Sequence, residues 1–445
     1  MGLRQKDREI LRDLAKEVAE ISVLPAQQET TAMWKALNGL EPVRPMVTIE
    51  SHVPWNELDG DPALGLHAQD PFCRGFETEF RRTLYCWRHM RGDMVVEPEV
   101  IIPKVIRSDG FGIGIEAKTE ASDPRNKVVS HSFIDQLRTD EDVQKIRPPT
   151  ICFDEEATAR VEEKAREIFD GVIPVRLQGW VPGVNQWPGL AEQPETRDLV
   201  HGMYGADDPN EYFGGFNPWD MICAWRGAEA VLLDLVERSQ FMHEIISKLT
   251  DAYLSMLDDM ERKGLLGYGQ ATIATTPAHT DELPHPGFDP ARPRAEDIWT
   301  MGMAQIFTSV SPAMFKEFEV DYAVKWYARF GLVYYGCCDA LDNKISVVRA
   351  IPNLRKISMS PWVNVERGAE QIGRDFVFSR KPNPASVAAD TWDPDAVEQD
   401  LKETIDACAR HGCPLELTLK DVSTVRYRPQ RLWEWADIAM RLVRQ

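Results

Sequence analysis

Hydrophobic and polar positions along the chain follow two periods, which predict helices and strands in succession. Leu11, Leu14, Val18 and Ile21 recur at helical spacing and indicate helices over residues 3–39. Later in the chain, short apolar runs of strand type alternate with longer amphipathic stretches. The expected strands are 46–50, 95–105, 174–180, 265–268, 303–308, 330–335, 354–359, 376–379 and 415–419.

Helices are expected between most of these strands, at 74–91, 155–169, 208–213, 230–235, 239–263, 312–329, 343–350, 364–373, 394–411 and 429–444. Strand–helix alternation predicts parallel strands covered by helices, so the fold class is α/β. About eight such strands favour a closed (β/α)8 TIM barrel. An open sheet has less support, because no G-x-G-x-x-G or P-loop motif follows any strand. We therefore expect a helical extension over 1–40 and one barrel with loop insertions over 41–445.

Composition excludes several classes of protein. The chain has 445 residues, 43% hydrophobic and 27% charged, which is typical of a globular protein. A net charge of −20 argues against nucleic acid and anionic membrane as partners. No apolar run is long enough to span a membrane, and the N-terminus lacks the apolar core of a signal peptide. We expect a cytoplasmic protein whose eight cysteines are thiols.

The most informative stretch is 332–343, L-V-Y-Y-G-C-C-D-A-L-D-N. An apolar strand ends at Gly336 and is followed by Cys337, Cys338 and Asp339. In α/β proteins, residues at the carboxyl ends of parallel strands face the ligand site, and thiolates and carboxylates are zinc ligands. The alternative is two small buried cysteines, the usual state of a free thiol. Only one of the pair is expected to face the site unless the turn rotates both.

Other strand ends and one long loop supply further candidates. Asp421 is a candidate metal ligand or general base, the alternative being a helix cap or a partner of Lys420. His279, in the loop 270–298, could supply a ligand or an acid–base group, or belong to a solvated loop. The candidate substrate-binding residues are His52, Trp55, Gln178, Gln305, Trp362, Lys381, Lys420 and His279.

Several segments, in the same order along the chain, resemble the uroporphyrinogen decarboxylase superfamily. These are A-L-N-G-L-E-P-V-R-P-M-V (36–47), the helical stretch 225–243, A-Q-I-F-T-S-V-S-P-A-M-F-K-E-F (304–318), the turn 335–338 and R-P-Q-R-L-W-E-W (428–435). The resemblance implies a TIM barrel. It also implies one of two branches, metal-free decarboxylases or zinc-dependent methyltransferases that work with a corrinoid protein.

The sequence departs from both branches. The arginine motif of the decarboxylases is replaced by S-H-V-P-W-N-E-L over 51–58. In the zinc motif of the methyltransferases, Tyr335 stands in place of histidine and Cys337 is retained, while Lys420 or Asp421 occupies the place of a later cysteine. A site richer in oxygen ligands is more Lewis-acidic, which suits an ether or alcohol-type oxygen better than an acceptor thiolate.

The resulting hypothesis is a methyltransferase that moves a methyl group between a small methoxy- or methylamine-type donor and a corrinoid protein. The catalytic candidates are Asp339 and Asp421, and the zinc candidates are Cys337, Cys338, Asp339 and Asp421. The corrinoid is expected on a partner, because the chain lacks a D-x-H-x-x-G motif. The alternatives are a metal-free decarboxylase or lyase and a non-catalytic corrinoid- or ligand-binding subunit. A homodimer is an open alternative to a monomer.

Overall fold

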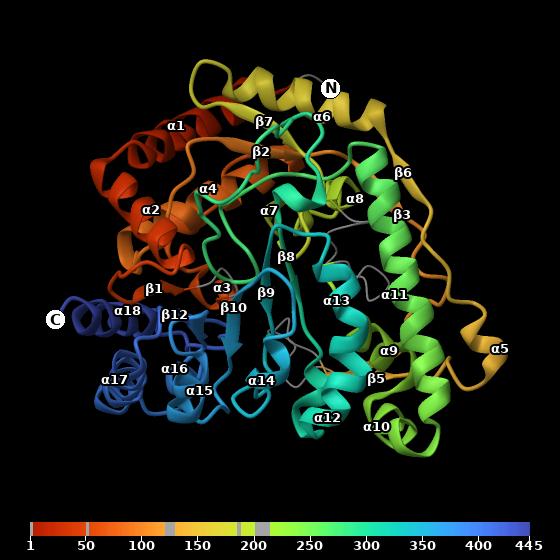
Figure 1. Cartoon of the computed structure of the whole chain (residues 1–445). Coiled ribbons are helices and arrows are strands. Elements are labelled where there is room, and N and C mark those ends of the chain that lie inside the picture. Colours follow the sequence, from red (N-terminus) through yellow and green to blue (C-terminus); the bar gives the residue numbers. More distant parts are fainter. Residues whose placement is uncertain (1–2, 50–52, 121–129, 185–187, 201–213) are drawn as a thin grey trace.

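A six-stranded parallel sheet forms the centre of the computed structural model, which describes residues 3–49, 53–120, 130–184, 188–200 and 214–445. The strand order is β1–β12–β11–β10–β9–β8, and each neighbouring pair is parallel (Figure 1). The strands are β1 (Met46–Ile49), β8 (Trp299–Gly302), β9 (Leu332–Tyr335), β10 (Leu354–Met359), β11 (Val377–Arg380) and β12 (Leu415–Leu419).

Among the described residues, further strands flank this sheet, and their pairings do not close it into a ring. A second parallel pair consists of β2 (Val100–Pro103) and β7 (Val175–Gln178). Single parallel bridges join Trp180 to Leu266 and Phe216 to Gly302. The antiparallel pairs are β3 (Ile106–Ser108) with β6 (Ile151–Phe153) and β4 (Ala117–Glu120) with β5 (Ser130–Phe133). The α/β class is thus confirmed, whereas the pairings between described residues do not confirm a closed TIM barrel.

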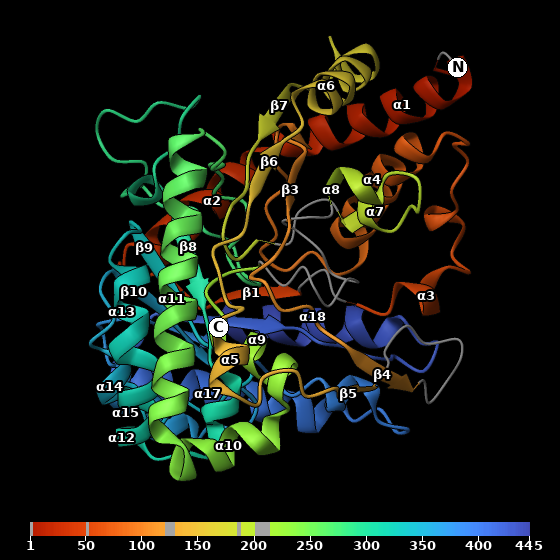
Figure 2. The ribbon, with the colours of Figure 1, turned by 90° about the vertical axis from the view of Figure 1, so that its right-hand side faces the viewer.

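Helices cover the sheet and extend the molecule at both ends. Figures 1 and 2 place α12, α14, α15 and α17 below the six-stranded sheet and α1 and α6 at the opposite end of the molecule. The helices are α1 (Gln5–Ser22), α2 (Pro25–Asn38), α3 (Trp55–Leu58), α4 (Pro71–His89), α5 (Asp140–Val143), α6 (Glu155–Phe169), α7 (Pro188–Ala191), α8 (Arg197–Val200), α9 (Pro218–Arg226), α10 (Ala228–Glu237), α11 (Ser239–Arg262), α12 (Pro312–Phe315), α13 (Asp321–Tyr327), α14 (Ile345–Val348), α15 (Val365–Ile372), α16 (Ala385–Ala388), α17 (Pro394–His411) and α18 (Gln430–Val443).

Two predicted strands are wrong. Of the expected strand 265–268, only Leu266 pairs, in a single bridge to Trp180. The run 303–308 was expected to be extended, but the strand lies earlier, at β8, and Gln305–Ser309 forms a 3-10 helix. The pairing partner explains the difference, because β9 ends at Tyr335 and its register with β8 ends at Gly302. An apolar run alone does not show where the neighbouring strand stops. The expected helix 208–213 lies outside the described residues.

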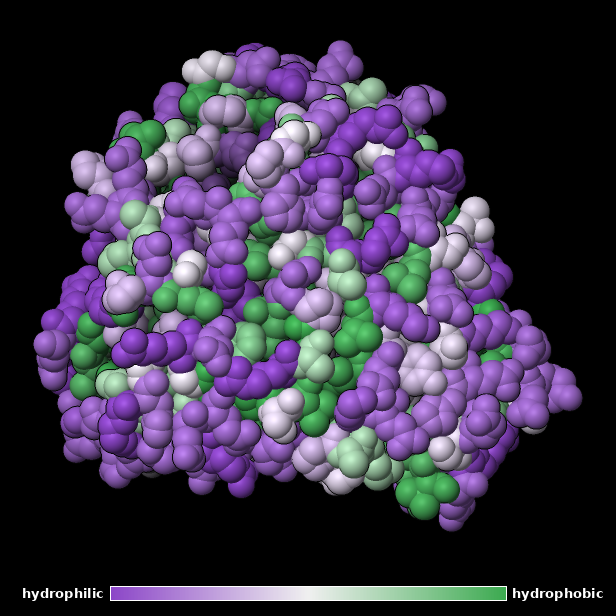
Figure 3. Space-filling model, in the orientation of Figure 1, coloured by the Kyte–Doolittle hydropathy of each residue, from purple (hydrophilic) through white to green (hydrophobic). Residues whose placement is uncertain are grey.

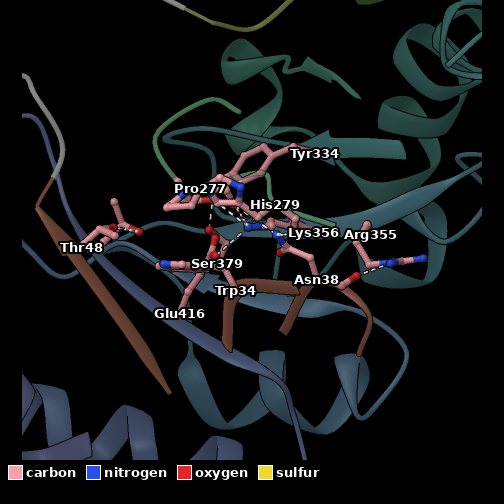
Figure 4. A network of polar contacts seen from close by, with 12 residues as sticks. Trp34, Asn38, Thr48, Pro277, His279, Tyr334, Arg355, Lys356, Ser379 and Glu416 are labelled. Atoms are coloured by element: carbon pink, nitrogen blue, oxygen red, sulfur yellow. Dashed lines mark hydrogen bonds and ion pairs between the residues drawn. The ribbon is translucent and has the colours of Figure 1, made fainter. Parts of the chain in front are cut away.

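The two faces of the sheet differ in chemistry. Val333, Ile357 and Leu417 point to the outer face and join the large core formed with the helices. The opposite, inner face carries a buried polar network, shown in Figure 4. There Lys356 Nζ lies 2.8 Å from Glu416 Oε2, and both side chains are fully buried. Because successive residues of a strand point to opposite faces, the network extends along the inner face toward the carboxyl ends.

The sheet is strongly curved, because contacts on its inner face skip strands. Tyr334 Oη on β9 lies 3.0 Å from Ser379 Oγ on β11, two strands away. Lys356 on β10 reaches Glu416 on β12, two strands away. Strand axes are spaced by about 4.8 Å, so such contacts favour a concave face that surrounds the network.

The outer surface is mostly polar. Figure 3 shows hydrophilic residues over most of one side of the molecule, with hydrophobic residues gathered toward its middle. This agrees with the net charge of −20. In the described part of the chain, none of the helices has the length and hydropathy needed to cross a membrane.

Candidate active site at the carboxyl ends of β9 and β12

A tight turn after β9 fixes the two adjacent thiols. Gly336 has a φ of +95°, and a Cβ there would lie 2.6 Å from Leu341 Cδ1. The backbone N–H of Cys337 donates to Asp339 Oδ1 at 3.0 Å, and Ser358 Oγ donates to the Cys337 carbonyl oxygen at 2.8 Å. The turn thereby brings the Sγ atoms of Cys337 and Cys338 to 3.5 Å from each other.

Lys420 supplies a positive charge between these sulfur atoms and a carboxylate. It follows Glu416 and Thr418 at two-residue spacing and leaves β12 on the inner face. Its Nζ lies 3.1 Å from Cys337 Sγ, 3.8 Å from Cys338 Sγ and 3.0 Å from Asp421 Oδ2. Although burial opposes it, the charges of Cys337 and Asp421 raise the pKa of Lys420, so the amine stays protonated.

Near neutral pH, the two cysteine side chains together hold one proton, in the hydrogen bond between their sulfur atoms. The hydrogen bond from Cys338 lowers the pKa of Cys337 to about 7, with burial opposing this and the charge of Lys420 assisting it. Sharing the same hydrogen bond, together with burial, raises the pKa of Cys338 above its usual range. Cys337 is therefore the thiolate of the pair at neutral pH, and a thiolate is the nucleophilic form of cysteine.

Two carboxyl groups near this thiolate have raised pKa values. Burial raises the pKa of Asp220, on α9, to about 7, and the charges of Cys337 and Asp339 act in the same direction. Gln305 Nε2 donates to Asp220 Oδ2 at 3.2 Å. Burial also raises the pKa of Asp339, whose Oδ2 is buried without a hydrogen-bond partner. With a pKa of about 7, Asp220 is partly protonated near neutral pH and can donate its proton.

Glu319 is a third buried acid of the same region. It lies in the π-helical segment Lys316–Val320, and such segments often occur at functional sites. Tyr335 Oη donates to Glu319 Oε1 at 3.1 Å, while Oε2 has no hydrogen-bond partner. Burial raises the pKa of Glu319 to about 8, with assistance from the charges of Asp339 and Asp220. Tyr335 thus orients an acid.

The arrangement does not fit a metal ion as it stands. In the part of the chain that the structure describes, no three histidine, cysteine, aspartate or glutamate side chains are placed so that they could hold one. The nearest donors are Cys337, Cys338 and Asp421, and the ammonium group of Lys420 contacts all three. Asp339 already uses Oδ1 to hold the turn. Zinc binding would require Lys420 to move away.

The structure brings only some of the sequence candidates together. Cys337, Cys338, Asp339, Lys420 and Asp421 form one cluster, which we call the thiol–lysine cluster. Gln305 donates to Asp220, whose pKa is raised by burial and by the charges of Cys337 and Asp339. The other described candidates lie outside this cluster.

Lys381 is buried and donates to Ser379, which Figure 4 shows as part of the inner network, while Trp362 is 69% exposed. Trp55 is buried, with its ring 6.1 Å from that of Tyr85. Their predicted role in substrate binding stays a prediction. His52 lies outside the described residues.

Two other candidates, Gln178 and His279, line a separate cavity. His279 was expected in a polar loop, but its side chain is buried and its carbonyl accepts from Asn38 Nδ2 at 2.8 Å. The loop folds back under the inner face, where Lys356 Nζ donates to Pro277 O at 3.0 Å (Figure 4).

Sequence reasoning missed Asp220 and Glu319. A signal for Glu319 was present, since it falls on the apolar face marked by Phe315, Tyr322 and Trp326 at helical spacing. A carboxylate on a buried helix face requires a polar partner or a raised pKa. Asp220 carries no comparable signal, because its helix is short and contains residues of mixed polarity.

Comparisons with known proteins leave the family open. No protein-family model matches the sequence, and no curated protein matches it. Among solved structures, a methyltransferase from Methanosarcina mazei is similar in backbone, with a TM-score of 0.46 and 11% sequence identity. The similarity covers 93% of this chain and 98% of that chain. The resemblance to the uroporphyrinogen decarboxylase superfamily therefore stays a prediction.

Proposed function

We propose that the chain is a methyltransferase that takes a methyl group from a small methoxy- or methylamine-type donor through the thiol–lysine cluster. The observation that carries the proposal is the contact of Lys420 Nζ with Cys337 Sγ at 3.1 Å, together with the half-buried acid Asp220, whose pKa is raised to about 7 by burial and by the charge of Cys337. A stabilised thiolate beside a proton donor is the pair of groups that displacement at a methyl carbon requires.

In the first step, Cys337 Sγ attacks the methyl carbon of the donor. A sulfur–carbon bond forms as the bond from carbon to the donor oxygen or nitrogen breaks. The leaving heteroatom takes the proton of Asp220 and departs as an alcohol or amine, and Asp220 becomes a carboxylate. Because Asp220 has a pKa of about 7, it is protonated often enough to act and acidic enough to release the proton.

In the second step, the methyl group passes from Cys337 Sγ to cob(I)alamin carried by a separate corrinoid protein. The sulfur leaves as a thiolate, and the ammonium group of Lys420 stabilises its charge through the 3.1 Å hydrogen bond. The location at the carboxyl ends of the parallel strands supports access by such a partner, because this edge is where α/β proteins bind their ligands.

The test is to incubate the protein with methoxylated and methylated-amine donors without corrinoid and analyse its peptides by mass spectrometry. We expect a methyl group on Cys337, lost in Cys337→Ser, with Cys338→Ser as the matched control that retains it. Addition of cob(I)alamin should then yield methylcob(III)alamin, detected by its absorbance. Methyl transfer at an unchanged rate by Cys337→Ser would overturn the proposal.

A zinc-bound form is the second candidate, favoured by the distance between the two sulfur atoms. Two thiolates on one tetrahedral zinc ion lie about 3.8 Å apart, close to the 3.5 Å found here. In that form Cys337, Cys338 and Asp421 would hold the ion, Lys420 would leave the cluster, and zinc would supply Lewis acidity. Metal analysis of the purified protein by plasma mass spectrometry distinguishes the two forms.

A further inference from the structure

A second cavity, with a volume of about 430 Å³, lies between β7 and the loops that follow Leu266. Its walls combine polar and aromatic side chains, among them Glu97, Arg176, Gln178, Tyr268, His279 and Phe288. None of the residues lining it belongs to the thiol–lysine cluster. The proposal below is therefore independent of the proposed methyl transfer.

Three polar atoms in the wall are buried and have no hydrogen-bond partner, namely Glu97 Oε1, Gln178 Oε1 and His279 Nε2. Gln178 is 4% exposed and His279 is 7% exposed. Glu97 Oε1 and His279 Nε2 lie 3.3 Å apart but do not form a well-directed hydrogen bond. Unpartnered buried polar atoms are costly, and the Glu97 and Gln178 oxygen atoms can only accept hydrogen bonds, so their position on one cavity indicates a ligand that brings donors.

The cavity also leaves room beside one of these acceptors. A Cβ on Gly269 would lie 3.3 Å from Gln178 Oε1, and one on Gly267 would lie 2.7 Å from Gln178 Cγ. Only Gly269 thus bears on the space beside Gln178 Oε1, because a Cβ on Gly267 would meet the Gly179 carbonyl oxygen at 2.4 Å. Tyr268 and Phe288, with ring centroids 4.8 Å apart, provide an aromatic wall to the same space.

The charges of the wall indicate the sign of that ligand. Arg176 is neutralised by Glu99, to which it donates at 2.8 Å, and its Nη1 donates to Tyr268 O. Lys104 donates to Gly264 O at 2.8 Å. Glu97 has only the imidazole of His279 beside it, so it is the one carboxylate among the described wall residues without a lysine or arginine partner.

We infer that this cavity is a binding site for a small protonated amine. The ammonium group donates to Glu97 Oε1 and Gln178 Oε1, and its carbon chain lies against Tyr268 and Phe288. A cation suits both the carboxylate and the aromatic faces, whereas a neutral alcohol of the same shape supplies a single donor and no charge.

The test is isothermal titration calorimetry of the full chain with butylammonium chloride, using butan-1-ol as the neutral isostere. We expect saturable binding of butylammonium and none of butan-1-ol. Glu97→Gln keeps the shape of the side chain and removes its charge, and it should weaken binding by at least about tenfold. Gly269→Ala should have a similar effect by filling the space beside Gln178.

Two controls keep the result interpretable. Cys337→Ser, in the thiol–lysine cluster, and Glu398→Gln, on the surface of α17, should both bind butylammonium as the wild type does. Thermal unfolding of each variant checks that it folds. If Glu97→Gln does not fold, the comparison of Gly269→Ala with the wild type provides the test. Absence of saturable binding, equal binding of butan-1-ol, or unchanged affinity in a folded Glu97→Gln or Gly269→Ala variant would overturn the inference.

Discussion

Lys420 Nζ on the last strand lies 3.1 Å from Cys337 Sγ, although β12 and β9 are separated by two other strands in the sheet. In a flat sheet, the strand axes would be about 14 Å apart. The contact exists because the sheet curves and the strand ends converge over its inner face. The position beside the sulfur atoms that a metal ion would need is thereby occupied by an ammonium group.

The first prediction concerns the reactivity of Cys337. Lys420→Met removes the charge that stabilises the thiolate, so the pKa of Cys337 should rise from about 7 toward its ordinary value. The rate of alkylation by iodoacetamide at pH 7 should then fall by about tenfold or more, because less thiolate is present. The measurement is the pH profile of alkylation, followed by peptide mass spectrometry. Lys402→Met, on the surface of α17, is the control, and an unshifted profile in Lys420→Met would contradict the prediction.

The second prediction concerns zinc. Removing the ammonium group in Lys420→Ala leaves Cys337, Cys338 and Asp421 without their cation. We expect this variant to retain more zinc than the wild type after dialysis, measured by plasma mass spectrometry. The double variant Lys420→Ala/Cys337→Ser should lose the added zinc. Stoichiometric zinc in the wild type, lost in Cys337→Ser, would instead favour the zinc-bound form.

The third prediction concerns stability and pH. Burial raises the pKa of Glu319 to about 8 in the folded protein, above the unfolded value, so the folded state binds more protons between these values. The stabilisation that protonated Glu319 gives the folded state is fully present below the pKa of Glu319 in the unfolded state, and it is lost as the pH rises toward 8. Glu319→Gln should remove this loss, which we expect to be on the order of 2–4 kcal/mol between pH 5 and 8. Urea unfolding at both pH values measures it. Parallel pH dependence in wild type and variant would show that Glu319 does not titrate in this way.

The fourth prediction concerns the buried pair of Lys356 and Glu416. Either Lys356→Met or Glu416→Leu alone leaves one charge buried without its partner, at a cost of about 3–5 kcal/mol in the free energy of unfolding. The double variant should recover much of this loss, because both charges are then removed. Urea denaturation of the three variants measures the coupling. Removing the surface pair Arg441–Glu398 should cost no more than about 1 kcal/mol by the same measurement.

Local pattern was sufficient to predict most of the elements and to bring part of the candidate site together. The expected strand 354–359 coincides with β10, and the expected helix 394–411 coincides with α17. Cys337, Cys338 and Asp339 are neighbours in the chain, so a single turn was enough to group them. Lys420 and Asp421 were predicted at the same edge because parallel strands place their carboxyl ends together.

Only the tertiary structure decided what these residues contact. Whether a metal ion or Lys420 lies beside the sulfur atoms depends on how strongly the sheet curves. The hydrophobic periodicity of the sequence does not indicate this curvature. Asp220 and Glu319 come from segments that are distant in the chain from Cys337 and Asp339, whose charges act on their pKa values. Gln178 and His279, predicted to belong to the same site as Cys337, instead line a separate cavity. Periodicity reports the direction of a side chain relative to its own element, whereas a site depends on the packing of several elements against one another.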